Sequence, residues 1–257
     1  MTTYLDLKQA HALITGGSEG IGRGLAARYL AAGSTVLITG RSPEKLARAA
    51  QELPGLRTFA NDIGTAAGRE ALANHVESTM AEINVLIDNA GFQRRVSLAA
   101  DSASWPERQA EIDTLLAAPV HLNHLLIPKM LRHGGPALLV NVTSGGAFVP
   151  QVFAPIYSAC KAALHSYTVT LRHALQQTPI RVVELIPPAV RTSLAGPGAT
   201  HGAPLDDFCD AAFSRLQRAD AEFVGFGPTD TSEFKGMIET GRPLFSSMSE
   251  RFPVAVY

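Results

Sequence analysis

The stretch His11-Ala-Leu-Ile-Thr15-Gly-Gly-Ser-Glu-Gly-Ile-Gly22 decides the fold of this chain. Its first five residues predict a short buried strand, and the glycines that follow, spaced G-x-x-x-G-x-G, predict a tight turn. Residues 23–33 continue as a helix, because Leu25, Tyr29 and Leu30 can share one face and Gly33 supplies a C-terminal stop. Glycines let the backbone approach a ligand, and the exposed N–H groups at a helix start favour an anion. The stretch therefore predicts the phosphate-binding turn of a dinucleotide site.

From this turn outward, strand-like and helix-like segments alternate without a linker, an internal repeat or a low-complexity tract. We expect strands at 11–15, 35–39, 56–60, 84–88, 137–142 and 180–186, and a last strand that includes Glu222-Phe-Val-Gly225. We expect helices near 20–32, 43–52, 65–81, 105–133 and 155–177. This order predicts an α/β fold, a single Rossmann-type domain over residues 1–257 with a doubly wound parallel sheet and helices on both faces. The site of such a fold lies at the carboxyl ends of its strands.

The composition limits the classes of partner. The 257 residues are 46% hydrophobic and 18% charged, as in ordinary globular proteins, and the formal net charge is −1. This charge gives no long-range attraction to nucleic acid or to an anionic membrane. No apolar run is long enough to span a bilayer and the first residues do not form a secretory signal, so we expect a cytoplasmic location. The 2 cysteines and 8 histidines lack metal-ligand spacing, so we expect no metal.

A second pattern carries the chemistry. Tyr157-Ser-Ala-Cys-Lys161 places a tyrosine and a lysine one helical turn apart on the same face, with Ser144 upstream. A tyrosine hydroxyl with its ordinary pKa of about 10 is a poor base at neutral pH. A nearby ammonium favours the phenolate and lowers that pKa, and a serine hydroxyl can hold the same substrate oxygen. The pattern is common in helices when it stands alone, but here it follows the glycine turn by about 130 residues. We therefore expect Ser144, Tyr157 and Lys161 to be catalytic.

Together these motifs resemble the classical short-chain dehydrogenase/reductase family over nearly the whole chain. Thr15-Gly-Gly-Ser-Glu-Gly-Ile-Gly22 resembles its cofactor turn, and Asp88-Asn-Ala-Gly91 resembles its Asn-Asn-Ala-Gly segment with aspartate at the first position. Pro187-Pro-Ala-Val-Arg-Thr192 resembles its Pro-Gly segment, with Pro188 in place of the glycine. Details such as the Pro-Pro pair and Ala162-Ala-Leu-His-Ser166 are similar to the DltE-like branch of the family.

The resemblance implies an oxidoreductase that interconverts a carbonyl compound and its alcohol by hydride transfer, with Tyr157 as general acid and base. It also implies that Lys161 bonds the nicotinamide ribose and Thr192 the carboxamide. Members are commonly dimers or tetramers through two long helices, so we expect a homodimer or homotetramer. The implied cofactor contacts are Gly16, Ser18, Gly20, Ile21, Gly22, Arg41, Ser42, Asp62, Ile63, Asn89, Ala90, Gly91, Tyr157, Lys161, Pro187, Val190 and Thr192.

The choice between NADP(H) and NAD(H) depends on the end of the second strand. NAD-binding proteins usually place Asp or Glu there to hold the ribose 2′-hydroxyl. Here Thr39-Gly-Arg-Ser42 has no acid, and Arg41 and Ser42 can bond a 2′-phosphate. Glu19 in the glycine turn is the contrary feature, because many NADP enzymes of the family carry a basic residue there. We predict NADP(H), with NAD(H) possible.

One departure from the family bears on turnover. Classical members usually have an asparagine on the helix before the serine strand, where it keeps a water relay beside the lysine. Alignment of Glu111-Ile-Asp-Thr-Leu-Leu-Ala-Ala-Pro119 puts Leu115 at that position. A leucine cannot hold a water, so either proton resupply to Tyr157 is slower or takes another path, or the protein binds cofactor with little turnover. Three classes stay open: a carbonyl reductase or alcohol dehydrogenase, altered chemistry such as epimerisation or imine reduction, and cofactor binding without turnover.

The substrate wall is predicted from residues near the catalytic positions. Gln93, Phe148, Gln151 and Phe153 are expected to contribute, and the Gly/Pro-rich residues 192–209 are expected to form a lid. The phenylalanines favour an apolar or aromatic carbonyl compound, whereas Arg94 and Arg95 would attract an acidic one. The tail, residues 240–257, is expected to pack on a partner subunit.

Overall fold

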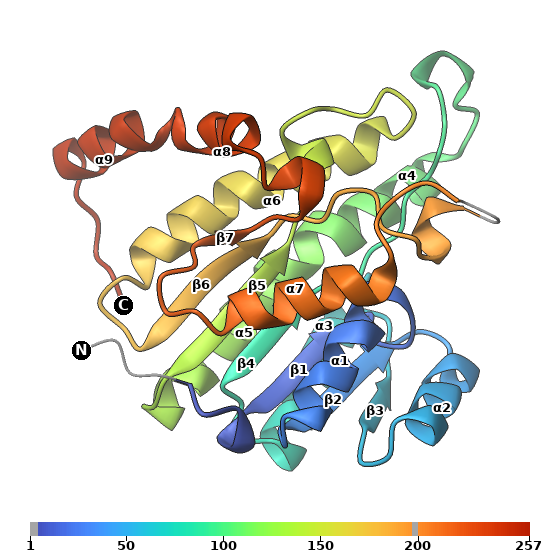
Figure 1. The fold of residues 1–257 in the computed structure, drawn as a ribbon, viewed down its shortest axis with the longest axis vertical. Coiled ribbons are helices and arrows are strands. Elements are labelled where there is room, and N and C mark those ends of the chain that lie inside the picture. The colour runs from blue at the N-terminus through green and yellow to red at the C-terminus, as the bar shows by residue number, and fades with distance from the viewer. Residues whose placement is uncertain (1–4, 197–199) are drawn as a thin grey trace.

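The computed structural model describes residues 5–196 and 200–257, and its centre is a seven-stranded parallel sheet (Figure 1). The strand order is β3-β2-β1-β4-β5-β6-β7. All strands run parallel, but the order in which successive strands are added to the sheet reverses between β1 and β4. This is the predicted doubly wound α/β sheet, and each predicted strand is confirmed to within two residues. The strands are β1 (His11–Thr15), β2 (Thr35–Gly40), β3 (Arg57–Ala60), β4 (Val85–Asp88), β5 (Ala137–Val142), β6 (Ile180–Leu185) and β7 (Phe223–Val224).

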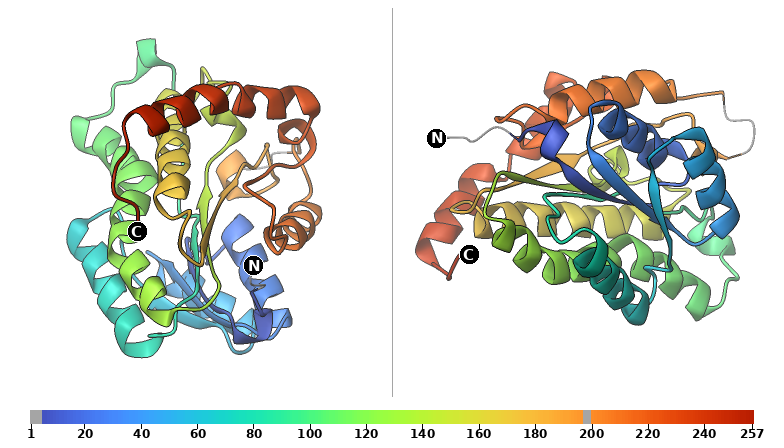
Figure 2. Two further views of the ribbon diagram at one scale, coloured as in Figure 1. Left: turned by 90° about the vertical axis from the view of Figure 1, so that its left-hand side faces the viewer. Right: turned by 90° about the horizontal axis from the view of Figure 1, so that it is seen from below.

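Helices cover both faces of the sheet, with α1 and α7 on one side and α3, α5 and α6 on the other (Figure 2). Because successive strand side chains point to opposite faces, Ile14 and Ile87 pack in the α1/α7 layer while Leu13 and Leu86 pack in the other. Two apolar cores result, one on each face. The helices are α1 (Gly20–Ala31), α2 (Pro43–Glu52), α3 (Ala66–Thr79), α4 (Trp105–Ile112), α5 (Ala118–His133), α6 (Pro155–Ala174), α7 (Leu205–Leu216), α8 (Ser232–Glu239) and α9 (Arg242–Arg251).

The predicted helix 105–133 is interrupted by a π-turn. α4 ends at Ile112, residues Asp113–Ala117 form the turn, and α5 continues from Ala118, whose N–H donates to the carbonyl of Asp113. A π-turn adds one residue to a helical turn, and such bulges are frequent at functional sites. Leu115 lies within it and is only 1% exposed.

Part of the predicted lid belongs to a packed helix. α7 begins at Leu205, and Phe208 and Cys209 are fully buried against the layer that contains α1. The glycines and prolines up to Pro204 conceal this start in the sequence, because they predict loop without marking where it ends. Residues 192–196 and 200–204 have loop character, apart from a short 3₁₀ turn at Ser193–Ala195, and residues 197–199 of the predicted lid lie outside the described part of the chain.

The C-terminal segment forms α8 and α9, which the sequence reading did not predict and which lie outside the two helical layers (Figure 1). It contacts α6 through the rings of Phe245 and His173, 5.7 Å apart, and through the Tyr257 N–H, which donates to the Ala174 carbonyl at 3.0 Å. The expected packing of this tail on a partner subunit stays a prediction. Its exposed apolar side chains include Leu244, Met248, Phe252 and Val254.

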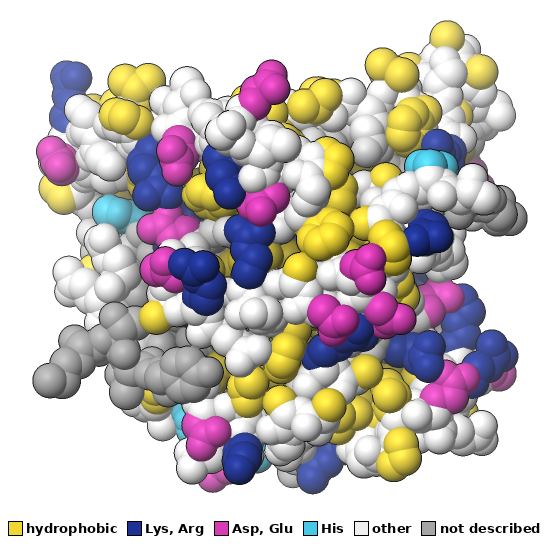
Figure 3. Space-filling model, in the orientation of Figure 1, with side chains coloured by type: hydrophobic (Ala, Val, Ile, Leu, Met, Phe, Trp, Pro, Cys, Tyr) yellow, Lys and Arg dark blue, Asp and Glu magenta, His cyan; other side chains and the backbone are white. Residues whose placement is uncertain are grey.

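The surface that carries α1 and α7 mixes charges of both signs (Figure 3). Such mixing produces no field of a single sign on this face, in keeping with the net charge of −1. Within residues 5–196 and 200–257, no helix combines the length and apolar character needed to cross a bilayer.

Candidate active site

A cavity of about 920 Å³ opens at the carboxyl ends of the central strands. Its volume suits a small-molecule or cofactor site. The order of the sheet reverses beside β1, and loops leaving β1, β2, β4, β5 and β6 meet there. The predicted residues that line it are Gly16, Ser18, Gly20, Ile21, Arg41, Ser42, Asp62, Ile63, Asn89, Ala90, Gly91, Gln93, Ser144, Gln151, Phe153, Tyr157, Lys161, Pro187, Val190 and Thr192.

The glycine turn is braced by the segment that follows β4. The Asn89 side chain donates to the carbonyls of Thr15 and Gly16 at 2.9 and 3.1 Å, and the Thr15 hydroxyl accepts the N–H groups of Asn89 and Ala90. Gly16 has φ +64°, and a Cβ there would lie 2.6 Å from Ala90 Cα. These contacts explain why the chain needs small residues where β1 and β4 end. They also make Asn89 a support for the turn as well as a wall of the cavity.

Gly22 does not line the cavity. A Cβ at this position would lie 2.5 Å from both the Asn89 amide nitrogen and the Gly16 carbonyl oxygen. The residue is therefore required for close packing of α1 against the turn. At the helix start, Glu19 makes no side-chain cap, so the first N–H groups of α1 have no side-chain partner from that residue.

Cationic side chains gather where β2 ends. Arg41, Ser42 and Lys45 line the cavity, and Lys45 Nζ pairs with Glu19 at 2.8 Å. This ion pair neutralises the charge of Glu19, the residue whose presence in the glycine turn spoke against binding of a 2′-phosphate. Ser42 caps α2 by accepting the Lys45 N–H at 3.2 Å. A long cavity with a glycine turn, open helix N–H groups and this cationic corner fits a phosphorylated dinucleotide.

Ser144, Tyr157 and Lys161 converge at the centre of the cavity. Ser144 follows the end of β5 and its Oγ accepts the Gly146 N–H at 3.0 Å, so its own O–H remains available to a ligand. Tyr157 and Lys161 lie one turn apart near the start of α6, and both are buried. Burial raises the pKa of the Tyr157 phenol above its ordinary value, and the nearby Ser144 hydroxyl offsets this only in part.

The Lys161 ammonium is anchored to the end of strand β5. Its Nζ donates to the Val142 carbonyl at 2.6 Å. Burial lowers the pKa of this ammonium to about 8, while the charges of Cys160, Asp88 and Glu184 act in the opposite direction. Lys161 is therefore mostly cationic at neutral pH and close to the range where it can release a proton.

A buried polar row crosses the sheet beneath α5 and α6. Parallel pairing sets Thr15 beside Thr39, Asp88 beside Asn141 and Asn141 beside Glu184, and the same register brings Thr15 opposite Asp88. None of the five is more than 5% exposed. Burial raises the pKa of Asp88 well above its ordinary value, and within the described residues neither of its carboxyl oxygens has a hydrogen-bond partner.

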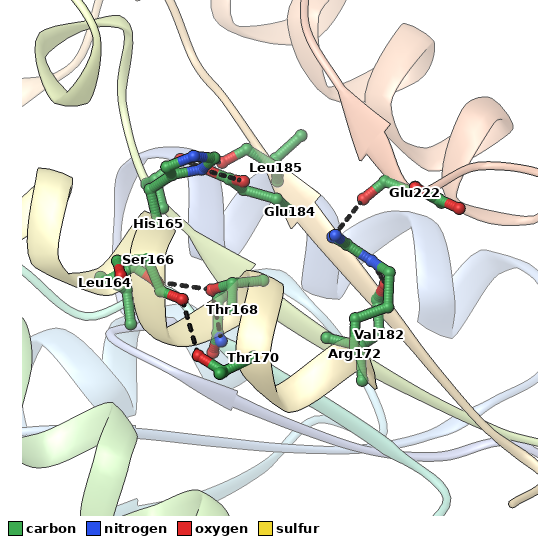
Figure 4. A network of polar contacts seen from close by, with 12 residues as sticks. Leu164, His165, Ser166, Thr168, Thr170, Arg172, Val182, Glu184, Leu185 and Glu222 are labelled. Carbon is green, nitrogen blue, oxygen red and sulfur yellow. Dashed lines mark hydrogen bonds and ion pairs between the residues drawn. The ribbon is translucent and has the colours of Figure 1, made fainter. Parts of the chain in front are cut away.

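The row ends at a partly exposed histidine. Glu184 accepts the Thr143 hydroxyl at 2.7 Å and pairs with His165 Nδ1 at 2.8 Å, and Figure 4 shows the histidine reaching from α6 to the strand. The His165 side chain is 24% exposed, whereas that of Glu184 is 1% exposed. Through Glu184 of β6, these two contacts connect Thr143, the residue before Ser144, to α6.

On the other side of Tyr157 the surroundings are apolar. Leu115, Ala154, Tyr157 and Cys160 form a buried cluster, against which Ile112, Leu116 and Ile156 pack. Leu115 Cδ2 would lie 2.9 Å from a Cβ at Gly91. Tyr157 thus lies between this apolar cluster and the polar row next to Lys161.

The end of the cavity beyond Ser144 and Tyr157 is closed by two loops. Gln93 Nε2 donates to Gln151 Oε1 at 2.9 Å, and the Val96 N–H donates to the Phe153 carbonyl at 2.9 Å. Phe148, expected in this wall, does not line the cavity. It packs behind it, with its ring 4.6 Å from His165 and 5.1 Å from Phe234.

Several lining residues were not predicted from the sequence. Phe234 comes from α8, a helix that carries no recognisable motif, whereas His201 belongs to the segment that was predicted as a lid. Asn61 precedes the predicted Asp62 and Thr114 precedes Leu115, so adjacency to a motif was the available signal for these two. In residues 5–196 and 200–257, no group of three or more His, Cys, Asp or Glu side chains is arranged to hold a metal ion.

Fold and cavity together define a doubly wound α/β protein with a dinucleotide-type site. The family described as short chain dehydrogenase matches residues 10–201. The chain therefore belongs to the short-chain dehydrogenase family and is an oxidoreductase of that family.

Known proteins agree with this assignment. The chain is 43% identical over 182 residues to the uncharacterized oxidoreductase DltE of Bacillus subtilis, covering 71% of this chain and 72% of the relative, which confirms the resemblance to that branch. It is 30% identical over 185 residues to sulfoacetaldehyde reductase 2 of Chromohalobacter salexigens, covering 70% and 72% of the two chains. A short-chain dehydrogenase from Sphingobium yanoikuyae in complex with NADPH has the same fold, with a TM-score of 0.81 and 23% identity over 96% of this chain and 98% of that one.

Proposed function

We propose that the protein is an NADP(H)-dependent oxidoreductase that interconverts a carbonyl compound and its alcohol. The observation that carries this proposal is the convergence of Ser144, Tyr157 and Lys161 on one cavity whose other end is the glycine turn. The names of its relatives, an oxidoreductase and an aldehyde reductase, support the same class of reaction. The NADPH complex of the Sphingobium protein supports a nicotinamide cofactor.

The chain's own groups divide the work around the substrate oxygen. The bound nicotinamide cofactor supplies or accepts the hydride. Ser144 donates its O–H to the carbonyl oxygen while one lone pair of its oxygen accepts the Gly146 N–H. Tyr157 gives its proton to that oxygen in reduction and takes it back in oxidation. The cationic Lys161 favours the phenolate that remains, and the Val142 carbonyl holds its ammonium in place.

Cofactor preference follows from the cationic corner at the end of β2. Arg41 is in the cavity wall, and it lies 5.9 Å from the centre of the Phe92 ring. A guanidinium bonds phosphate oxygens in pairs, which a ribose hydroxyl cannot match. With Glu19 neutralised by Lys45, the balance favours the 2′-phosphate of NADP(H).

The apolar cluster around Leu115 favours one alternative, cofactor binding without rapid turnover. Apart from Tyr157 itself and the Cys160 thiol, this cluster contains only hydrocarbon side chains, which supply no proton to the phenol, so the proposed proton path runs through Lys161. Epimerisation or imine reduction with the same tyrosine is compatible with the same surroundings.

The test is a panel of ketones, aldehydes and diketones mixed with purified protein and NADPH or NADH, followed by the loss of absorbance of the reduced nicotinamide. Oxidation by some carbonyls that requires Tyr157 supports the reductase. Tight NADPH binding without oxidation by any compound contradicts it. In that case Leu115→Asn distinguishes a missing proton path, which the variant restores, from a different function, which it leaves unchanged.

A further inference from the structure

The charged side chains of the cavity are unevenly distributed. Its two lining carboxylates, Glu19 and Asp62, both lie at the cofactor end, where Glu19 pairs with Lys45 and Asp62 accepts the Gly64 N–H at 2.9 Å. Beyond Ser144 and Tyr157, no Asp or Glu lines the described wall, which instead contains Arg95 and His201. A cationic wall without a counter-ion favours an anionic ligand.

Two adjacent arginines have different environments in this wall. The Arg94 guanidinium bonds Asp101 through two nitrogens, at 2.6 and 3.3 Å, and its backbone N–H donates to Glu111. Contacts within the protein thus occupy both the guanidinium and the backbone N–H of Arg94. Arg95 lies on the Phe153 ring with its guanidinium carbon 4.2 Å from the ring centre, and no ion pair involves it within the described residues.

Stacking prepares Arg95 to bind an anion. The aromatic ring covers one face of the guanidinium and leaves the N–H groups at its edge available. The loop that carries it is fixed on both sides of Arg95, by Gln93 on Gln151 and by Val96 on Phe153. An arginine held in this way loses less conformational entropy on binding than one that moves freely in solvent.

From these contacts we infer that the substrate carries an anionic group, a carboxylate or a chemically similar oxyanion, and that Arg95 binds this group. Ser144 and Tyr157 then hold the carbonyl oxygen of the same molecule. The inference rests on the proposed reductase function and names its substrate class. It also assigns the wall a role other than the apolar or aromatic selectivity suggested by Phe148, which lies behind the cavity.

Arg95 interacts with a part of the substrate that does not react. Removing its charge is therefore expected to raise KM about ten-fold or more and to change kcat less. Esterification of the substrate carboxylate removes the same interaction from the other partner. The two changes should not add, because each abolishes a single contact.

The experiment compares short oxo-acids with their methyl esters as substrates, using NADPH. We expect wild-type protein to prefer the acids by about ten-fold in kcat/KM and Arg95→Gln to lose that preference while ester reduction stays within about two-fold. Arg95→Lys should restore part of the preference. Arg48→Gln, which alters an exposed arginine of α2 outside the cavity, is the matched control and should behave as wild type. Equal use of acids and esters by wild-type protein, or an equal loss on both in Arg95→Gln, overturns the inference.

A binding measurement separates this inference from the proposed function. Malonate, which has no reducible carbonyl, is titrated into the NADPH-bound protein while the melting temperature is followed, with sodium chloride at matched ionic strength as control. Saturable stabilisation of wild-type protein that Arg95→Gln abolishes supports the inference even if no carbonyl in the panel is reduced. Equal behaviour of the two proteins overturns it. Failure of the panel alone counts only against the reductase proposal.

Discussion

The cofactor end and the substrate end of the cavity are built in different ways. At the cofactor end, the side chains of the buried Thr15 and the half-buried Asn89 bond the backbone where β1 and β4 end, and the strands fix their positions. At the substrate end, side chains on loops contact one another: Gln93 bonds Gln151, and Arg95 lies on the ring of Phe153, which is 40% exposed. The first end requires particular residue types because the backbone geometry requires them. The second requires only shape and charge, which many residues can supply.

The largest expected effect lies where the two ends meet. Tyr157→Phe should lower turnover at least about a hundred-fold, because the substrate oxygen loses its proton donor, and should leave NADPH affinity within a few-fold. Steady-state kinetics and NADPH fluorescence titration measure the two quantities. Tyr167→Phe, on the same helix and packed against the core, is the control and should keep turnover within about three-fold. Retention of most activity in Tyr157→Phe would remove the tyrosine from the mechanism.

Next in size is a change confined to the cofactor end. Arg41→Asp should weaken NADPH binding about ten- to a hundred-fold and NADH binding much less, because the new carboxylate repels the 2′-phosphate. Competition titrations of both cofactors test this, with Arg48→Asp as a matched charge reversal away from the cavity. Unchanged NADPH affinity in Arg41→Asp would refute the assignment. A parallel loss for both cofactors would show that Arg41 supports the site without reading the phosphate.

The pH dependence probes the lysine below the tyrosine. Lys161 has a pKa lowered to about 8 by burial, so it is charged below that pH and neutral above it. If the cation assists Tyr157, kcat/KM for reduction is highest below pH 8, where Lys161 is charged. It then falls about ten-fold between pH 7 and pH 9. A pH-rate profile measures this, and Lys161→Arg should move the decline to higher pH. A flat profile across this range in wild-type protein would contradict the role.

The smallest expected effect concerns the polar row. Because the pKa of Asp88 is raised in the folded protein, the folded state binds this proton more tightly than the unfolded one, and stability decreases as pH rises through the folded pKa. Asp88→Asn should therefore raise the free energy of unfolding at neutral pH by about 1–2 kcal/mol, and with it the melting temperature by a few degrees. The difference should shrink toward pH ~4, near the unfolded pKa of aspartate. Calorimetry at both pH values measures it; a lower melting temperature for the variant at neutral pH would show that the carboxylate is stabilised by a contact.

The motifs predicted the sheet and the cofactor end of the cavity because their residues are selected for the backbone conformations that they allow. Glycines mark turns, alternation marks strands, and the carboxyl ends of parallel strands meet at one edge. The position of Gly22 was predicted but not its role, because a cofactor contact and close packing select the same residue. The sequence also could not separate Arg94 from Arg95, since only the fold brings Asp101 to one and Phe153 to the other. Phe148 was misplaced for a similar reason, because its partners come from α6 and α8.

The π-turn between α4 and α5 sets the rotational phase of these helices. Each residue of an α-helix turns the chain by about 100°. The extra residue in Asp113–Ala117 therefore rotates the side chains of α4 about the helix axis relative to those of α5. Removal of one residue from this turn would leave the composition almost unchanged but would rotate α4 relative to α5. Glu111 would then leave the backbone of Arg94, and the loop that carries Arg95 would lose an anchor. A deletion that leaves Ser144, Tyr157 and Lys161 unchanged would in this way change what the cavity recognises.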